Sequence, residues 1–177
     1  MQGVYQGLYN TDPPDVGALL DAVEAGNLNR VRELLDGGDV GVNEADGGGW
    51  TALHGAAVGG DVALVEMLIK SGAKVNQAME DGCTPLYVAS QEGKLEVVKA
   101  LIKAKAKVNQ AMENGVTPLY VASQEGHLEV VKVLIEAKAK VNQARGDGFT
   151  PLFIASQLGN LEVVKVLIEA KAKVNQA

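Results

Sequence analysis

Side chains that could carry acid–base, nucleophilic or metal chemistry are few and widely separated in this chain of 177 residues. The only histidines are His54 and His127, and the single cysteine is Cys83. Catalysis needs a nucleophile beside its base or converging carboxylates, and zinc needs three or four nitrogen or sulfur ligands. We therefore expect no catalytic residues, no metal site and no cofactor, and we predict that the chain is not an enzyme.

Cys83 is predicted to be an inert thiol, because no basic residue stands beside it in the sequence to lower its pKa. A single cysteine forms no internal disulfide, which is compatible with a reducing compartment. No run of residues is long and apolar enough to span a membrane, and residues 1–15 lack the pattern of a secretory signal. These features predict a cytoplasmic or nuclear location.

Glycine-rich stretches occur at residues 47–49 and 146–148, but no Lys-Ser or Lys-Thr follows them as in a phosphate-binding loop. We interpret both as turns that need glycine. The second stretch overlaps Arg145-Gly146-Asp147, a tripeptide of the integrin-binding kind. The stretches in register with it read Met79-Glu80-Asp81 and Met112-Glu113-Asn114, so ordinary variation at a loop tip is the favoured interpretation.

The elements that would position these residues follow from a four-residue string that returns every 33 residues. TALH begins at Thr51, TPLY at Thr84 and Thr117, and TPLF at Thr150. Threonine at an N-cap followed by proline in the first turn starts a helix, and a glycine about eight residues later ends it. Each copy therefore predicts a short first helix.

A second helix is predicted in each copy after that glycine. Its apolar residues fall at helical spacing, as in Val98, Leu101 and Ile102. Glu96 and Lys99 stand three residues apart on the opposite side, where such a pair belongs to a solvated face.

This pattern resembles the ankyrin-repeat family, whose period is about 33 residues. The resemblance covers nearly everything from residue 16 onward. It implies an all-α fold with short β-hairpin fingers, built as a solenoid of stacked helix-turn-helix units. The expected segments are a flexible arm over residues 1–15, a divergent N-terminal repeat over 16–45, and regular repeats over 46–78, 79–111, 112–144 and 145–177.

The resemblance also assigns structural roles to the string itself. The histidine of the family, here His54, bonds to the threonine hydroxyl and to neighbouring backbone. Tyr87, Tyr120 and Phe153 stand at the same position, where we expect them to pack between repeats.

Two departures from the family pattern are visible. The second helices of the later repeats are followed by Lys105, Lys138 and Lys171, where the family has a glycine in left-handed conformation. The last repeat also reads like an internal one and lacks the polar outer face of a terminal cap. Either the chain is excised from a longer array, or it self-associates through this uncapped repeat.

Family members contact partners through the finger residues before the threonine and through the solvent side of the first helix. Two of the matching residues, Trp50 and Phe149, are large aromatics, which are enriched at binding hot spots. The alternative is that each ring packs on its own neighbour. The full set of predicted partner-binding residues is Trp50, Val58, Glu80, Asp81, Cys83, Gln91, Glu92, Glu113, Asn114, Val116, Gln124, Glu125, Arg145, Asp147, Phe149, Gln157 and Leu158.

The net charge of −6 is uneven, because residues 1–77 carry a net charge of −7 and the remainder +1. Such an acidic portion disfavours nucleic acid and membrane surfaces as partners. The leading hypothesis is a scaffold that binds a protein partner. Nearly identical repeats leave an engineered scaffold without an evolved partner as the alternative. Small-ligand or nucleotide binding, with Trp50 stacked on a base, ranks lower because the face lacks lysines.

Overall fold

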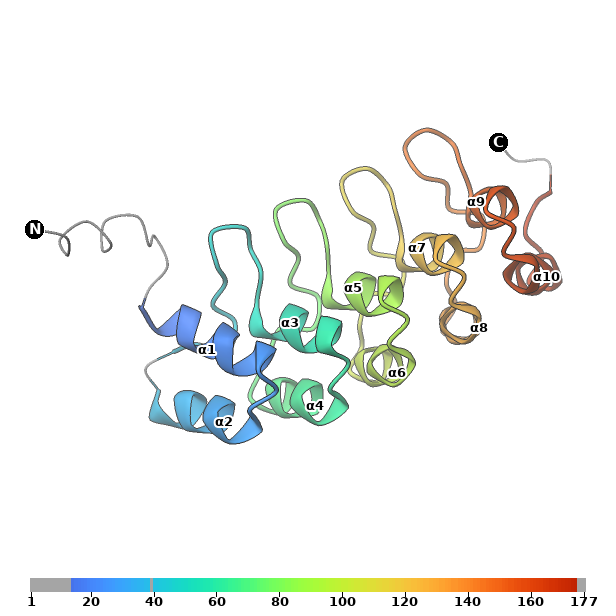
Figure 1. The fold of residues 1–177 in the computed structure, drawn as a ribbon. Helices are drawn as coiled ribbons and strands as arrows, with labels where there is room; N and C mark the ends of the chain where they lie inside the picture. The colour runs from blue at the N-terminus through green and yellow to red at the C-terminus, as the bar shows by residue number, and fades with distance from the viewer. Residues whose placement is uncertain (1–13, 39, 175–177) are drawn as a thin grey trace, which may run out of the picture.

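The computed structural model describes residues 14–38 and 40–174, so the predicted N-terminal arm lies almost entirely outside the described residues. In the described part, ten helices form five antiparallel pairs (Figure 1). The first helices of the pairs are α1 (Pro14–Glu24), α3 (Ala52–Gly59), α5 (Pro85–Gln91), α7 (Pro118–Gln124) and α9 (Pro151–Gln157). The second helices are α2 (Leu28–Gly37), α4 (Val62–Lys70), α6 (Leu95–Lys103), α8 (Leu128–Glu136) and α10 (Leu161–Glu169).

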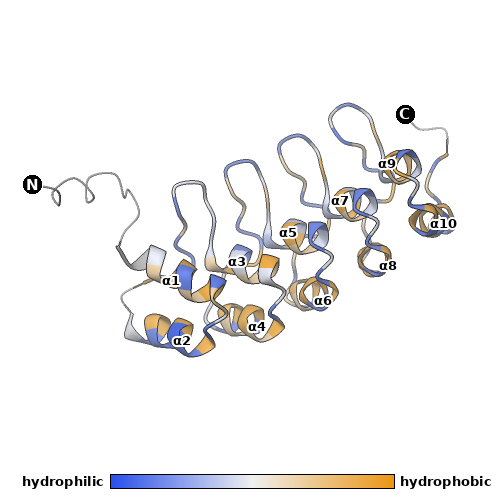
Figure 2. Cartoon of the chain, viewed as in Figure 1, coloured by the Kyte–Doolittle hydropathy of each residue, from blue (hydrophilic) through white to orange (hydrophobic). Residues whose placement is uncertain are grey.

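The pairs stack side by side into a solenoid, which confirms the predicted all-α repeat fold (Figure 1). The first helices form one row, the second helices form another, and the loops between pairs project together on one side. Hydrophobic residues concentrate on the helices, whereas the tips of the projecting loops are largely hydrophilic (Figure 2). No helix in the described ranges is long and apolar enough to cross a membrane.

Threonine caps begin the first helices as the sequence predicts. The Thr84 hydroxyl accepts a hydrogen bond from the backbone N–H of Tyr87 at 3.2 Å, and Pro85 occupies the first turn. The threonines at the same position cap α7 and α9 in the same way. Each cap satisfies a backbone donor that the helix itself leaves free, so the first helix starts at the same residue in each of these repeats.

The core lies between the two rows of helices and continues from one repeat to the next. One valine in each of α2, α4, α6 and α8 is completely buried. In α4, α6 and α8 the leucine three residues after that valine is completely buried as well. These residues are Val31, Val65, Val98, Val131, Leu68, Leu101 and Leu134. Because neither helix pair encloses these side chains alone, each repeat depends on its neighbours for its core.

The projecting loops, which we call fingers, are less regular than the predicted β-hairpins. The finger over residues 79–83 is closed by backbone hydrogen bonds from Met79 N–H to the Cys83 carbonyl (2.8 Å) and from Gly82 N–H to the Met79 carbonyl (3.0 Å). Within the described residues, the only isolated β-bridge joins Ala45 and Thr51. The arms of each finger are too short for a continuous ladder of strand pairs.

Neighbouring fingers are joined to one another through their backbones. Glu113 N–H donates to the Asp81 carbonyl and Gly146 N–H to the Asn114 carbonyl, each at 2.9 Å. A Cβ on Gly82, which has a φ of +87°, would lie 2.9 Å from the Met112 Cα. Glycine is therefore needed there both for its conformation and for the close approach of the next finger.

The three lysines that follow the later second helices adopt the left-handed conformation that the resemblance implied. The φ angles are +69° at Lys105, +70° at Lys138 and +66° at Lys171. Glycine stands at this position in the preceding repeat, where Gly72 has a φ of +92°. A residue with a Cβ is disfavoured in this region by steric contact with its own backbone.

Replacing Lys138 with glycine is expected to raise the free energy of unfolding by about 0.5–1 kcal/mol, because the left-handed strain is relieved. Chemical denaturation of the Lys138→Gly variant measures the change. Lys140→Gly is the matched control, since Lys140 lies in the same loop, is also exposed and has no positive φ. Stabilisation equal to that of the control, or a loss of stability at position 138, would contradict this account.

Candidate partner-binding face

The fingers and first helices lie on the same side of the solenoid, and we call the segments 46–60, 79–93, 112–126 and 145–159 the finger face (Figure 1). Most of the predicted partner-binding residues are exposed there. The exposed ones are Val58, Glu80, Asp81, Gln91, Glu92, Glu113, Asn114, Glu125, Asp147, Gln157 and Leu158. Gln124 and Arg145 are half-buried. The structure thus brings these residues together on one face of the solenoid.

Two of the predicted contact residues, Cys83 and Val116, are buried, and each exposes only 7% of its surface. Both stand directly before the threonine cap, where the finger turns into the first helix. Burial, together with the smaller effect of the Asp81 charge, raises the pKa of the Cys83 thiol to about 12. The thiol is therefore protonated at neutral pH, which agrees with the predicted inert cysteine.

The two aromatic finger residues pack on their own neighbours. The Trp50 ring stacks on His54 with ring centroids 5.5 Å apart, and the Phe149 ring stacks on Phe153 at 4.2 Å. Both Trp50 and Phe149 are half-buried. Each ring therefore contributes to the packing of its own repeat and leaves only part of its surface for a partner.

His54 makes the structural contacts that the resemblance implied. Its Nδ1 atom lies 2.8 Å from the Thr51 hydroxyl oxygen and 3.2 Å from the Thr51 backbone N–H, and its Nε2 atom lies 3.2 Å from the Cys83 carbonyl oxygen. A carbonyl oxygen only accepts, so Nε2 carries the proton and Nδ1 accepts from threonine. Burial lowers the pKa of His54 and keeps the ring neutral.

Charge is segregated across the solenoid in a way that the uneven halves of the sequence do not reveal. The finger face holds seven carboxylates and one arginine, whereas all thirteen lysines lie outside it. The carboxylates are Asp46, Glu80, Asp81, Glu92, Glu113, Glu125 and Asp147. Counting charges by position within the repeat, rather than along the chain, would have found this acidic face from the sequence.

The one arginine of the finger face, Arg145, is tied to its own finger. Its Nε and Nη2 atoms donate to the Asp147 carboxylate, with both Nε contacts at 3.0 Å. This hydrogen bond lowers the pKa of Asp147. The arginine and the aspartate of the integrin-type tripeptide are therefore hydrogen-bonded to each other.

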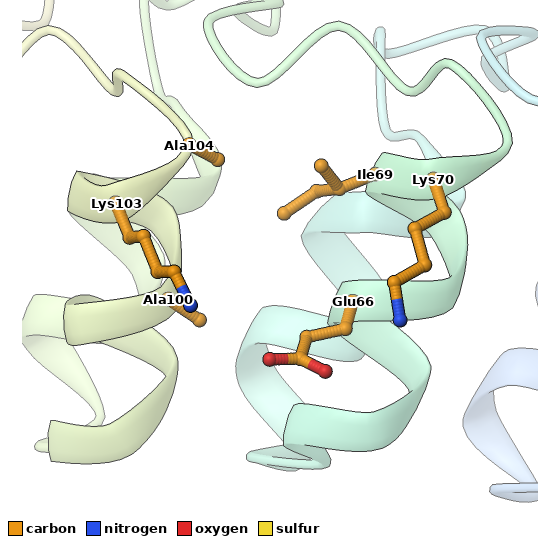
Figure 3. Close-up of a pocket in the computed structure, with 6 residues that line it drawn as sticks. All are labelled: Glu66, Ile69, Lys70, Ala100, Lys103 and Ala104. Carbon is orange, nitrogen blue, oxygen red and sulfur yellow. The ribbon is translucent and has the colours of Figure 1, made fainter.

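A separate groove of about 370 Å³ lies between α4 and α6, in the row of second helices (Figure 3). On its α6 side stands Ala100, where α8 and α10 have the larger Val133 and Val166. The groove is lined by Glu66, Ile69, Lys70, Ala100, Lys103 and Ala104. The two lysines and one carboxylate at its edge leave it distinct in charge from the acidic finger face.

Stacked antiparallel helix pairs with aligned fingers define a helical repeat protein. Residues 19–112 and 104–177 match the family model for ankyrin repeats (3 copies), so the chain belongs to the ankyrin-repeat family. Members of this family are generally protein–protein interaction modules and are typically not enzymes. A comparison with curated proteins finds none that matches this chain.

Stability is expected to fall with pH below the ordinary His54 pKa of 6.5, because the folded chain favours neutral imidazole more strongly than the unfolded chain does. The contribution of His54 is complete above pH 6.5 and is lost as the pH falls through the lower folded pKa, with a slope of at most about 1.4 kcal/mol per pH unit. Denaturation between pH 8 and pH 5 measures this slope.

The control is His54→Tyr, which places here the tyrosine found in the next two repeats. Both proteins carry the same carboxylates, so the comparison isolates the contribution of the histidine. An identical dependence of unfolding free energy on pH in both proteins would contradict the assignment.

Proposed function

We propose that this protein binds a basic protein partner along the acidic finger face. The supporting observation is the charge segregation, which leaves seven carboxylates and a single arginine on the fingers and first helices. Complementary charge steers association and suppresses wrong partners. A partner with clustered lysine or arginine residues fits this surface, whereas nucleic acid does not.

The geometry of the face suits an extended contact. Backbone hydrogen bonds join neighbouring fingers, and the first helices lie beside them in one row. A partner that spans four repeats could bury on the order of 1,600 Å² in total, the size of a standard protein interface. Ordered fingers also reduce the entropy that binding would otherwise cost.

Nucleotide binding is less well supported. Phosphate recognition needs lysine, arginine or backbone amides aimed at the ligand. Trp50, the base-stacking candidate, already stacks on His54, and the finger face carries no lysine. The engineered-scaffold alternative predicts no dominant partner, which the following experiment distinguishes.

Reversing two carboxylates of the finger face is expected to weaken capture of the partner from a cell lysate by at least about tenfold, because like charges then face each other. The variant is Glu92→Lys with Glu125→Lys, two exposed residues at the ends of α5 and α7. Quantitative mass spectrometry of captured proteins, at low and high salt, measures the effect.

The matched control is Glu96→Lys with Glu129→Lys, which makes the same change of net charge in α6 and α8 on the other row. Capture should persist with this control. Equal capture by all three proteins, or equal loss by both variants, would place the contact elsewhere, and no dominant partner for the unaltered chain would favour the engineered-scaffold alternative.

We also propose that the protein self-associates through an apolar surface on its last repeat. Leu158, Leu161, Ile168 and Val174 are exposed and belong to one end of the solenoid. Apolar clusters of this kind favour an interface. Among the described residues of the first repeat, no large apolar side chain is exposed, so two copies would meet end to end through the last repeat of each.

Light scattering at increasing protein concentration is expected to show a rising average mass, because association follows mass action. Leu161→Glu with Ile168→Glu should abolish the rise by placing charges in the contact. The control is Glu162→Gln, which changes an exposed residue of α10. The matching leucine of α6, Leu95, is half-buried and therefore gives no matched control. A constant monomer mass for the unaltered chain would refute this proposal.

A further inference from the structure

The first residue of the finger differs in chemistry from repeat to repeat. Met79 and Met112 are half-buried and pack against hydrophobic residues. The first finger carries Asp46 at this position, and the last finger carries Arg145. Its guanidinium carbon lies 5.8 Å from the centroid of the Tyr120 ring and 5.9 Å from that of Phe149. At these distances a cation is attracted to the faces of aromatic rings.

The phenol beneath this arginine is buried and unsatisfied. Tyr120 exposes 1% of its surface, and its hydroxyl has no hydrogen-bond partner. Tyr87 lies in the same string, PLYVASQEG, yet is half-buried. Arg145 lies over the Tyr120 ring and Phe149 packs against the same cluster, whereas the finger that follows Tyr87 has Met112 and Val116 at these two positions. A buried hydroxyl without a partner is costly to leave unsatisfied.

Three side chains therefore converge at one point of the finger face: Tyr120 with its unpaired hydroxyl, Phe149, and the carboxylate of Asp147. Arg145 uses its Nε and Nη2 atoms on Asp147 and leaves the Tyr120 hydroxyl without a partner. Because only Gly146 separates Arg145 from Asp147 in the chain, the backbone restricts the orientation of the Arg145 guanidinium relative to the Asp147 carboxylate and the Tyr120 hydroxyl. An arginine that arrives from solvent has no such restriction.

We propose that Arg145 occupies, in the free chain, a cation site that accepts an arginine side chain of the partner. The incoming guanidinium lies on the Tyr120 and Phe149 rings, pairs with both oxygens of Asp147, and donates an N–H to the Tyr120 hydroxyl. This inference rests on the proposed function and specifies the partner's chemistry at one position. Arginine is favoured over lysine because a planar guanidinium both stacks on rings and pairs with a carboxylate through two hydrogen bonds.

Displacement of Arg145 is feasible because the resident pair is exposed. The side chains of Arg145 and Asp147 are 36% and 38% exposed. Exposed ion pairs contribute little to stability, so Arg145 can swing into solvent. When Arg145 fills the site, a competing arginine cannot bind. The apparent affinity for that arginine therefore equals the intrinsic affinity multiplied by the fraction of molecules in which the site is empty.

Titration with the peptide acetyl-Gly-Arg-Gly-amide, followed by the ring-proton NMR signals of Tyr120 and Phe149, tests the site directly. Arg145→Ala is expected to bind the peptide about tenfold more tightly than the unaltered chain, the factor for a site that Arg145 fills in about nine-tenths of free molecules. Arg145→Met, which introduces the residue of the two preceding fingers, should bind more weakly than Arg145→Ala because the thioether covers the rings.

Two further variants in the Arg145→Ala background separate the carboxylate and the phenol. Asp147→Asn should weaken binding about tenfold, and Tyr120→Phe should weaken it by a smaller factor. The matched control is Glu136→Gln, an exposed carboxylate at the end of α8 that lies outside the finger face. It should leave the peptide affinity unchanged, and melting temperatures verify that each variant is folded.

The same peptide with citrulline in place of arginine keeps the shape and removes the charge. Equal affinity for both peptides, no gain from Arg145→Ala, or no loss from Asp147→Asn would each overturn the proposed arginine site. If one of these results is obtained while Glu92→Lys with Glu125→Lys still weakens partner capture, the arginine site is refuted and the acidic-face function is retained. Loss of the capture effect with arginine binding intact instead removes the broader acidic-face function.

Discussion

The structure depends on burial of each repeat by the next one along the chain. The helices α8 and α10 have the same sequence, LEVVKVLIE, and so provide an internal comparison. Leu128 and Ile135 of α8 are half-buried, whereas the matching Leu161 and Ile168 of α10 are 68% and 49% exposed. The sequence is identical, so the difference is due to the repeat that packs on α8 and has no counterpart at α10 among the described residues.

Hydrogen bonds between repeats hold this stacking in register. The Asn43, Asn76 and Asn109 side-chain oxygens accept backbone N–H groups from the loop of the following repeat at 2.6, 2.6 and 2.7 Å. The contacts recur at the same position of each repeat. Because the spacing is repeated, residues 33 positions apart in the sequence come to lie side by side.

This alignment turns a residue preference at one position into a property of a whole face. Carboxylates at the finger tips and at the ends of the first helices gather into an acidic surface, and lysines gather elsewhere. It also places the side chain of one finger over an aromatic ring of the preceding repeat, as Arg145 lies over Tyr120. Both proposals for function therefore derive from the same stacking that forms the core.

The sequence by itself determined the repeat and the helix starts at the threonine caps and, through the family resemblance, the left-handed lysines and the role of His54. These features depend on local contacts or on neighbours that the period of the repeat fixes. Only the tertiary structure decided that Cys83 and Val116 are buried, that Trp50 and Phe149 stack on their neighbours, and that the Tyr120 hydroxyl has no partner. Burial at the finger base depends on how the finger folds over its helix and its neighbour. A repeated sequence specifies which positions become neighbours, but the packed solenoid decides which side chain covers which.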